Sequence, residues 1–223
     1  MKIVVIEDHA LIRDLLVKAC SELPGGAEVL GARDGAAGLV LCREHQPDIL
    51  VLDLALPDGD GIDFLTALRA ASPSTRVIAL TSHTDEFTVH RALSAHVQGF
   101  VDKNEQPLDI LAQAIREVMA GRSFLSSVAL RAKATLRSDP VAFSKLLSDH
   151  EQYLLGLFGL SLSNEEVGEL LGVTPNTAKN HRQGIMGKLS IHSTPHLIRY
   201  AAEKGFTRVA QQRMNARAAV AKS

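Results

Sequence analysis

Five short apolar runs alternate with amphipathic segments over the first 120 residues, and this alternation constrains the fold more than any other feature of the chain. The runs have the length of buried strands, and the segments between them have the apolar spacing of helices. Parallel strands joined by crossover helices produce this pattern, so we predict an α/β doubly wound, five-stranded parallel sheet. The expected strands are Ile3–Ile6, Val29–Leu30, Ile49–Leu52, Val77–Leu80 and Phe100–Val101. The expected helices are Leu11–Ser21, Gly35–Glu44, Ile62–Ala70, Thr84–Ala95 and Leu108–Ala120.

The charge of the 223-residue chain divides it into two unlike halves. Residues 1–120 hold 10 Lys and Arg against 18 Asp and Glu, a net charge of −8. Residues 121–223 hold 14 against 7, a net charge of +7. Two halves of opposite sign indicate two domains with different partners, and the basic half is the candidate for binding a polyanion.

The composition is typical of a globular cytoplasmic protein, with 46% hydrophobic and 22% charged residues. No apolar run approaches the roughly 20 residues of a membrane span, so we expect no contact with a membrane. The apolar run in the opening "MKIVVIEDHA" is too short for a signal peptide. Cys20 and Cys42 lie in helix-like segments without metal or redox spacing, and we expect both to be free core thiols.

Polar side chains stand at the carboxyl ends of four predicted strands: Glu7 and Asp8, Asp53, Thr81 and, just beyond the last strand, Lys103. In a doubly wound sheet these ends form one edge, where sites assemble. Clustered acids repel one another unless a cation binds, and hard oxygen ligands suit Mg²⁺. A metal beside Asp53 would neutralise a phosphoryl group arriving there, and Lys103 and Thr81 could hold its oxygens. Any single acid is explained more simply as a solvated strand-end charge, but five suitable groups together favour a site.

These residues lie in segments that resemble the receiver domain of two-component response regulators, which has a flavodoxin-like fold. The resemblance covers residues 1–122 and rests on "VVIEDHALIRDLL", "LVLDLALPDGDG", "ALTSHTD" and "GFVDKNEQP". It implies that Asp53 accepts a phosphoryl group from a sensor histidine kinase. The implied Mg²⁺ ligands are Asp8, Asp53, the Ala55 carbonyl and, through water, Glu7. The implied switch residues are Thr81 and Phe100, and the implied phosphate-binding residue is Lys103.

Two histidines stand out against that family pattern. His96 occupies the middle of Ala95–His96–Val97, where the family usually has Ala-Gly-Ala, and His tolerates a left-handed backbone less easily than Gly. His83, two residues after Thr81, is expected near the phosphoryl site, and a surface-loop histidine is the alternative.

The second half of the chain is rich in helix start signals. Capping boxes are present in Ser148-Asp149-His150-Glu151 and in Ser163-Asn164-Glu165-Glu166. A capping threonine precedes a proline at Thr174–Pro175 and again at Thr194–Pro195. We therefore predict four helices, near residues 149–160, 164–171, 175–189 and 195–203. The segment before them, residues 123–144, is expected to be a partly helical linker that breaks at Asp139–Pro140.

The second and third of these helices are joined by "LGVT", a tight turn that contains Gly172. This is a helix-turn-helix pattern, in which the third helix enters the major groove of DNA. Its inward stripe consists of Ala178, Ile185 and Leu189, and its other side carries Asn176, Lys179, Asn180 and Gln183. Amide and ammonium groups can bind base edges, whereas Arg182 and Lys188 are better placed for phosphates. For this helix alone, an ordinary amphipathic helix with a solvated polar face is an equal alternative.

The segment "SNEEVGELLGVTPNTAKNHRQGIMGKL" resembles the LuxR-type DNA-binding domain found in NarL/FixJ-type regulators. The resemblance covers about residues 145–206 and includes Thr177, Lys179 and Lys188. It implies that double-stranded DNA is the partner and that Lys179, Asn180 and Gln183 face the groove. It also implies that the last helix forms a dimer contact through the apolar face of Leu197, Ile198 and Ala201, for which packing within the same domain is the alternative.

Two features of this half depart from a stable, simple domain. Gly184 and Gly187 lie inside the expected groove helix, where each glycine costs about 1 kcal/mol relative to alanine. The tail "AQQRMNARAAVAKS" carries basic residues and no acid, and we expect a frayed helix or a disordered extension that touches DNA phosphates.

Together these features predict a receiver domain over residues 1–122, a linker over 123–144, a LuxR-type domain over 145–208 and a basic tail over 209–223. The predicted function is that of a cytoplasmic response regulator rather than an enzyme, acting as a homodimer when phosphorylated. The alternative is a DNA-binding regulator that uses its receiver for dimerisation without phosphorylation. A phosphatase or phosphotransferase that uses Asp53 as nucleophile fits poorly with a helix-turn-helix domain. The sequence does not identify the input signal, the kinase or the target genes.

Overall fold

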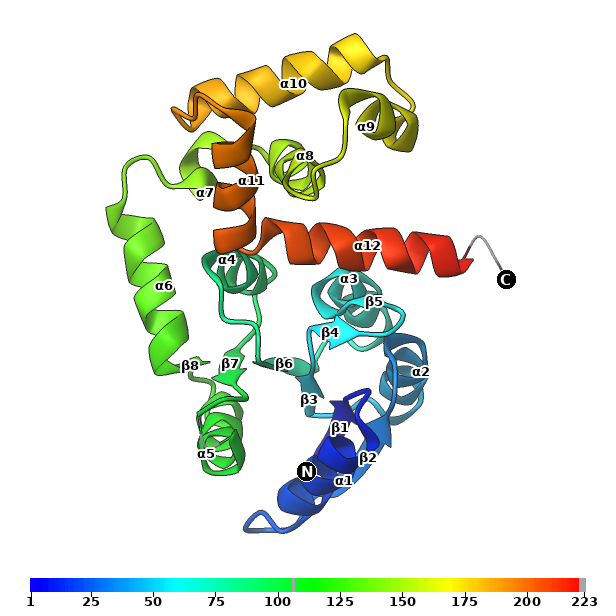
Figure 1. Ribbon diagram of the computed structural model, residues 1–223. Coiled ribbons are helices and arrows are strands. Elements are labelled where there is room, and N and C mark those ends of the chain that lie inside the picture. The colour runs from blue at the N-terminus through cyan, green and yellow to red at the C-terminus, as the bar shows by residue number, and fades with distance from the viewer. Residues whose placement is uncertain (106, 221–223) are drawn as a thin grey trace.

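The computed structural model describes residues 1–105 and 107–220, and its first half is built on a parallel sheet (Figure 1). Six strands lie in the order β2-β1-β3-β6-β7-β8. Their bounds are β1 Lys2–Ile6, β2 Glu28–Ala32, β3 Ile49–Leu52, β6 Arg76–Thr81, β7 Gly99–Asp102 and β8 Phe124–Leu125. A separate hairpin joins β4 (Ala55–Leu56) to β5 (Gly59–Asp60). The parallel sheet confirms the predicted fold class, but the expected count of five strands is wrong.

The sixth strand, β8, lies in the segment expected to be linker. Phe124 and Leu125 pair in parallel with Gly99 and Phe100 of β7. A strand of two residues has no periodicity to recognise, so only its neighbour in space identifies it as a strand.

Five helices cover the two faces of the sheet. Their bounds are α1 Ala10–Ser21, α2 Gly35–His45, α3 Gly61–Ala71, α4 Glu86–Ser94 and α5 Pro107–Met119. Side chains of α1 and α5 pack on one face, and side chains of α2, α3 and α4 pack on the other. Cys20 and Cys42 are free and buried in these two cores, and burial raises the pKa of their thiols to about 11 and about 12. Both cysteines are therefore core thiols, as predicted.

The expected linker is packed into both halves. It contains α6 (Ser127–Ser138) and the short α7 (Phe143–Leu146). Ala129 and Ala132 of α6 lie in the core of the sheet domain, whereas Leu136 lies in the core of the second half. The segment thus connects two cores and does not behave as a solvated spacer.

The second half contains the four predicted helices and one more. Their bounds are α8 Asp149–Gly159, α9 Asn164–Leu171, α10 Pro175–Lys188, α11 Thr194–Glu203 and α12 Phe206–Val220. Both predicted capping boxes form, because Ser148 and Ser163 each exchange hydrogen bonds with the glutamate three residues on. The helix α9 ends at Gly172, which has a φ of 67°. No helix in the described part of the chain has the length and apolarity needed to cross a membrane.

The fifth helix, α12, occupies most of the expected basic tail, and it lies between the two halves (Figure 1). Phe206, Val209 and Ala210 are buried in the core of the second half. Gly156 of α8 makes this close packing possible, since a Cβ there would lie 2.8 Å from the Phe206 carbonyl oxygen. The expectation of a frayed or disordered tail is wrong for residues 209–220, and residues 221–223 lie outside the described part of the chain.

Candidate functional site

The carboxyl edge of the sheet brings together Asp53, Glu7 and Lys103. The Lys103 Nζ lies 2.6 Å from Asp53 Oδ2 and 2.6 Å from Glu7 Oε2. Asp53 is 6% exposed and Glu7 is 1% exposed, so two buried carboxylates share one partly buried ammonium. Burial alone would lower the pKa of Lys103, but the two carboxylates outweigh it and raise that pKa. The lysine is therefore held in its charged form at this edge.

Asp8 lies at the same edge but has a different immediate partner. Its carboxylate is 2.8 Å from His9 Nδ1, and this hydrogen bond raises the pKa of the exposed His9. One ligand atom from each of Glu7, Asp8 and His9 lies within 4.8 Å of the others, a spacing that could hold a metal ion. Sequence reasoning identified the two acids but missed His9, which simply follows them in the chain.

One backbone group and one side chain help to fix the positions of these acids. The Ala55 N–H donates to Asp53 Oδ1 at 3.1 Å. The Arg13 guanidinium of α1 donates to the backbone carbonyl of Glu7 at 2.9 Å and to that of Asp8 at 3.3 Å. This role of Arg13 was not predicted, although the residue lies in α1 shortly after the acidic pair.

The expected switch residues are both fully buried. Thr81 ends β6, and its hydroxyl accepts a hydrogen bond from the His83 N–H at 3.2 Å. Phe100 on the adjacent strand β7 has no exposed surface and packs in the core with α4. His83 is half-buried rather than a free loop residue, and burial together with nearby Arg208 lowers its pKa. His96 adopts the left-handed conformation considered for it, with a φ of 54°.

The helix-turn-helix geometry is present in the second half, in α9, the turn and α10. Gly168 lets the turn pack against α9, because a Cβ there would lie 2.8 Å from the Val173 carbonyl oxygen. Thr174 caps α10 by accepting from the Thr177 N–H at 3.1 Å, and Pro175 occupies the first helical turn. Local sequence therefore sets both the end of α9 and the start of α10.

The expected groove face of α10 is open to solvent. Lys179, Asn180 and Gln183 are exposed, whereas Ala178 and Ile185 are completely buried. In Figure 1 this helix lies at the end of the molecule opposite the sheet. The structure thus brings the three predicted base-contacting side chains onto one accessible surface.

The other predicted DNA contacts are partly engaged within the chain. The Lys188 Nζ is 2.7 Å from a carboxylate oxygen of Glu151, and this pair lowers the pKa of Glu151. The Arg182 guanidinium lies 5.8 Å from the ring centre of Phe158. The Thr177 hydroxyl is 2.9 Å from that of Thr174. A phosphate contact by Lys188 would therefore compete with an existing ion pair.

The predicted dimer face on α11 is not available in this structure. Leu197 and Ala201 have no exposed surface and lie in the core of their own domain, and Ile198 is half-buried. The reason is close packing on α8, since a Cβ at Gly159 would lie 2.5 Å from that of Ala201. For Leu197 and Ala201 the alternative interpretation, packing within the domain, describes the structure.

Two family models match the chain. The response regulator receiver domain matches residues 3–115, and the luxR family of bacterial regulatory proteins matches residues 145–201. The chain is 30% identical over 214 residues to the oxygen regulatory protein NreC of Staphylococcus epidermidis, with 92% of this chain and 98% of NreC covered. It is 31% identical over 209 residues to the DNA-binding transcriptional activator DevR/DosR of Mycobacterium tuberculosis, with 91% and 94% covered.

A solved structure shares the fold. It is RcsB from Salmonella enterica serovar Typhimurium bound to promoter rprA in the presence of the phosphomimetic BeF3⁻. The TM-score is 0.65 at 22% identity, with 91% of this chain and 98% of that chain covered. A likeness at this level of identity concerns the fold alone.

Proposed function

This chain belongs to the two-component response regulators of the NarL/FixJ type, and from that premise we propose that a phosphoryl group on Asp53 controls its binding to DNA. The observation that carries the proposal is the Asp53–Lys103–Glu7 cluster in a chain that also presents an open groove helix. The proposed action takes place in the cytoplasm, where bacterial DNA lies. The family membership makes the chain a transcription regulator and not an enzyme.

The proposed chemistry is transfer of a phosphoryl group from a sensor histidine kinase. An Asp53 carboxylate oxygen attacks phosphorus, the bond from phosphorus to the kinase imidazole breaks, and the imidazole nitrogen takes up a proton. Lys103 already contacts Asp53 Oδ2, so its ammonium can move to a phosphoryl oxygen over a short distance. Thr81 can donate its hydroxyl proton to a second oxygen once it releases the His83 N–H.

The oxygen-rich donor set of the same edge suits Mg²⁺. The ion would be held by Asp8, Asp53 and the Ala55 carbonyl, with Glu7 acting through water. When bound, the ion supplies positive charge that stabilises the phosphoryl oxygens. The neighbouring carboxylates of Glu7 and Asp8 support this assignment, because they lie close enough to share one ion.

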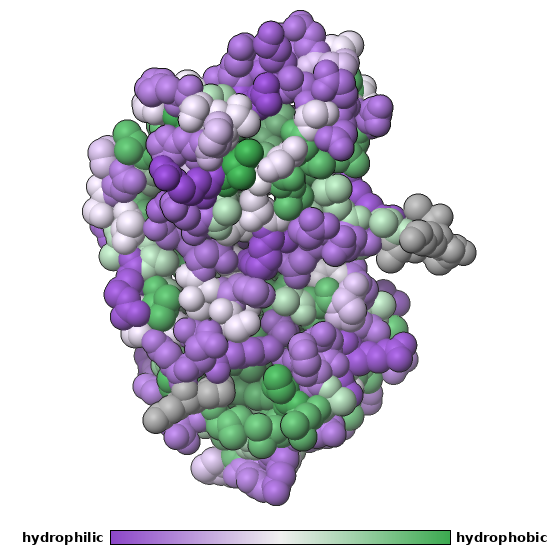
Figure 2. Space-filling view, in the orientation of Figure 1, coloured by the Kyte–Doolittle hydropathy of each residue, from purple (hydrophilic) through white to green (hydrophobic). Residues whose placement is uncertain are grey.

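An exposed apolar surface on α1 gives the kinase a place to dock. Leu11, Ile12 and Leu15 are 83%, 38% and 50% exposed, directly after the acidic pair. Figure 2 shows apolar side chains gathered over this end of the sheet domain. Because Asp53 itself is buried, a phosphodonor protein needs an adjacent surface to position its histidine, and exposed apolar patches commonly mark such contacts. We therefore assign this surface to the kinase.

The proposed DNA interaction places α10 in the major groove. Lys179, Asn180 and Gln183 would contact base edges, and Thr177, Arg182 and Lys188 would contact the backbone. One such helix covers one half-site, so a homodimer on a two-fold site is the expected binding unit of the phosphorylated chain. Since Leu197 and Ala201 are buried, pairing through α11 would need its half-buried and exposed residues, among them Ile198.

The test combines occupancy of Asp53 with DNA affinity and mass in solution. Beryllofluoride with Mg²⁺ should occupy Asp53 stoichiometrically, raise affinity for a selected duplex and increase the sedimentation coefficient. Asp53→Asn should abolish all three responses. Unchanged affinity and sedimentation in a chain whose Asp53 is occupied would instead support a receiver that works without phosphorylation.

A further inference from the structure

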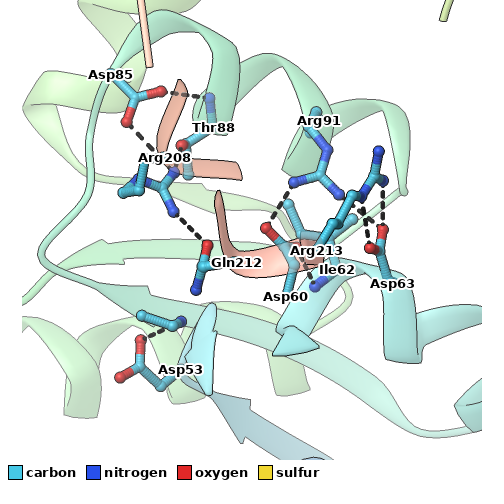
Figure 3. A network of polar contacts seen from close by, with 11 residues as sticks. Asp53, Asp60, Ile62, Asp63, Asp85, Thr88, Arg91, Arg208, Gln212 and Arg213 are labelled. Carbon is cyan, nitrogen blue, oxygen red and sulfur yellow. Dashed lines mark hydrogen bonds and ion pairs between the residues drawn. The ribbon is translucent and has the colours of Figure 1, made fainter. Parts of the chain in front are cut away.

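The helix α12 joins the DNA-binding helices to the receiver through charged contacts at two separate places (Figure 3). Its first turns belong to the core of the second half, where Phe206, Val209 and Ala210 are buried. Arg208 and Arg213 point the other way, toward α3 and α4 of the receiver. We call these contacts, Arg208 with Asp85 and Thr88 and Arg213 with Asp63, the two-point contact.

The first point is the start of α4. Arg208 donates to the Thr88 hydroxyl and lies 3.4 Å from Asp85 Oδ2. Asp85 is also the cap of α4, since its other oxygen accepts from the Thr88 N–H at 2.8 Å. The backbone approaches closely here as well, because a Cβ at Gly205 would overlap the Asp85 carboxylate. The contact therefore holds the cap that begins α4.

The second point is the start of α3. Arg213 binds Asp63 with two hydrogen bonds, of 2.7 and 2.8 Å. Arg91 of α4 binds the same carboxylate at 2.8 Å and the buried Asp60 at 2.7 Å. Burial would raise the pKa of Asp63, but Arg213 and Arg91 outweigh it and lower that pKa. An ionic network thus links α12 to α3 and α4 together.

Both points lie directly downstream of a residue of the phosphoryl site. Asp85 follows Thr81 by four residues, and the intervening turn is held by the Thr81 hydroxyl that accepts from the His83 N–H. Asp63 lies in the first turn of α3, whose first residue, Gly61, packs on the Asp53 backbone. A Cβ at Gly61 would lie 2.4 Å from the Asp53 carbonyl oxygen. Thr81 and Asp53 are therefore connected through short, packed segments to the carboxylates that bind α12.

An apolar contact completes the docking surface. The Phe87 ring of α4 stacks on Phe206 with ring centres 4.0 Å apart, and Phe143 of α7 packs edge-on against both. Phe87 is 5% exposed and lies in the core of the second half, although it belongs to the receiver. The Phe87 N–H donates to the Lys204 carbonyl at 3.1 Å, and Lys204 Nζ is 2.7 Å from Glu86.

The docked state leaves the groove face of α10 exposed, so it restrains the DNA-binding half without covering its DNA-binding surface. What docking fixes is the orientation of that half relative to the receiver. Two half-sites on DNA require two such helices in a defined arrangement, so the orientation that docking fixes bears directly on whether a pair can form.

We propose that α12 is the helix that senses Asp53: its two-point contact restrains the DNA-binding half of the unmodified chain, and phosphorylation weakens that contact. The inference rests on the proposed function and adds the element that carries its regulation. Thr81, on turning to the phosphoryl group, releases the His83 N–H and shifts Asp85 away from Arg208. The freed domain then pairs on a two-fold site.

The test uses the full chain and a duplex selected by the beryllofluoride-treated wild type from a random-sequence pool. Arg208→Ala/Arg213→Ala should bind this duplex about tenfold more tightly than the wild type without beryllofluoride, which corresponds to about 1.4 kcal/mol. Beryllofluoride should then add little further affinity. Arg217→Ala is the matched control, because Arg217 lies on the same helix but outside the two-point contact. Its guanidinium carbon lies 5.8 Å from the ring centre of Tyr153 in α8. This variant should behave as wild type.

A conservative variant separates loss of the contact from loss of the fold. Arg208→Lys/Arg213→Lys keeps both positive charges opposite Asp85 and Asp63, so it should keep low basal affinity and most of the beryllofluoride response. If the double alanine variant keeps wild-type basal affinity and the full response, α12 does not carry the regulation, although the proposed function stands. If the wild type fails to respond with Asp53 occupied, the proposed function and this inference fall together.

Discussion

The two functional ends of the molecule differ in how far the fold has closed them. At the sheet edge, Asp53 is 6% exposed and its carboxylate is held by Lys103. At the far end, Lys179, Asn180 and Gln183 stand in solvent on α10. The proposed phosphoacceptor is therefore nearly buried and held in an ion pair, whereas the proposed groove helix is already open to solvent.

This difference indicates where regulation acts in the unmodified chain. A switch that hid the groove helix would bury its polar face, and here that face is exposed. The surface that is buried lies between the ends, where Phe87 stacks on Phe206, and the more exposed Arg213–Asp63 pair lies on the same α12 interface. Control of the relative orientation of the two halves is consistent with this arrangement.

The largest expected effect is at the closed end. Asp53→Asn should abolish modification by a small phosphodonor, because the amide is a far weaker nucleophile than the carboxylate. Lys103→Ala should retain part of the modification but lose most of the DNA response, since the ammonium binds the phosphoryl group and is not the nucleophile. Intact-mass measurement of the modified chain checks both. Modification of Asp53→Asn at the wild-type level would place the phosphoacceptor elsewhere.

The next effect is at the buried surface between the ends. Phe87→Ala should lower the free energy of unfolding by about 3 kcal/mol, because it removes a buried ring from the apolar contact with Phe206. The matched control is Leu130→Ala on α6, where the side chain is 53% exposed and the change should be small. Urea denaturation of the full chains compares them. Equal losses in the two variants would show that the stacking contributes little.

The closed end was largely predictable from the sequence, and the reason is local. Apolar runs identify the strands, parallel strands place their carboxyl ends at one edge, and Asp53, Glu7 and Lys103 then meet there. The helices of the second half were equally accessible, because Ser148 and Ser163 cap their own helices within four residues. Each of these signals lies in one short stretch of chain.

The surface between the ends was not predictable in the same way. Arg208 and Arg213 bind carboxylates about 120 and 150 residues earlier in the chain, so the local tail shows only basic charge without an acid. A signal was present in Phe206, Val209 and Ala210, whose spacing is that of a helical apolar stripe. This signal was weak evidence for a packed helix, because the residues that follow are mostly polar. The structure buries Leu197 and Ala201 within their own domain and not on an open dimer face. An apolar helix face in a sequence does not show whether its own domain or a partner covers it.

A smaller effect distinguishes base contacts from backbone contacts at the open end. Lys179→Ala and Gln183→Ala should each reduce discrimination between selected and random DNA by about 1–3 kcal/mol. Lys188→Ala should weaken binding to both DNAs alike and reduce the salt slope by about one. Its effect should be diminished by the existing pair with Glu151. Affinity against salt on both duplexes checks this, and equal losses for the Gln183 variant would contradict the groove assignment.

The smallest expected effect concerns Gly187 of the same helix. A Cβ at Gly187 would meet nothing within 4 Å among the described atoms. Gly187→Ala should therefore raise the free energy of unfolding by about 1 kcal/mol through helix propensity alone. Gly168→Ala is the contrasting change, since its Cβ would lie 2.8 Å from a backbone oxygen and should destabilise the turn. Thermal denaturation that ranks the two variants in the reverse order would contradict the geometry of the helix-turn-helix.

The central claim, that Asp53 controls how the two halves are docked, is tested most directly by hydrogen exchange at the Phe87 amide. Phe87 lies in the first turn of α4, where a helix supplies no carbonyl partner, and its N–H donates across the interface to Lys204. The control is the Val89 amide, which donates to Asp85 within the same segment at 3.0 Å.

Beryllofluoride should speed exchange at Phe87 by about tenfold or more, and exchange at Val89 should change little, because only the docking contact is lost. Unchanged exchange at Phe87, in a chain whose Asp53 is occupied and whose DNA affinity has risen, would contradict the claim.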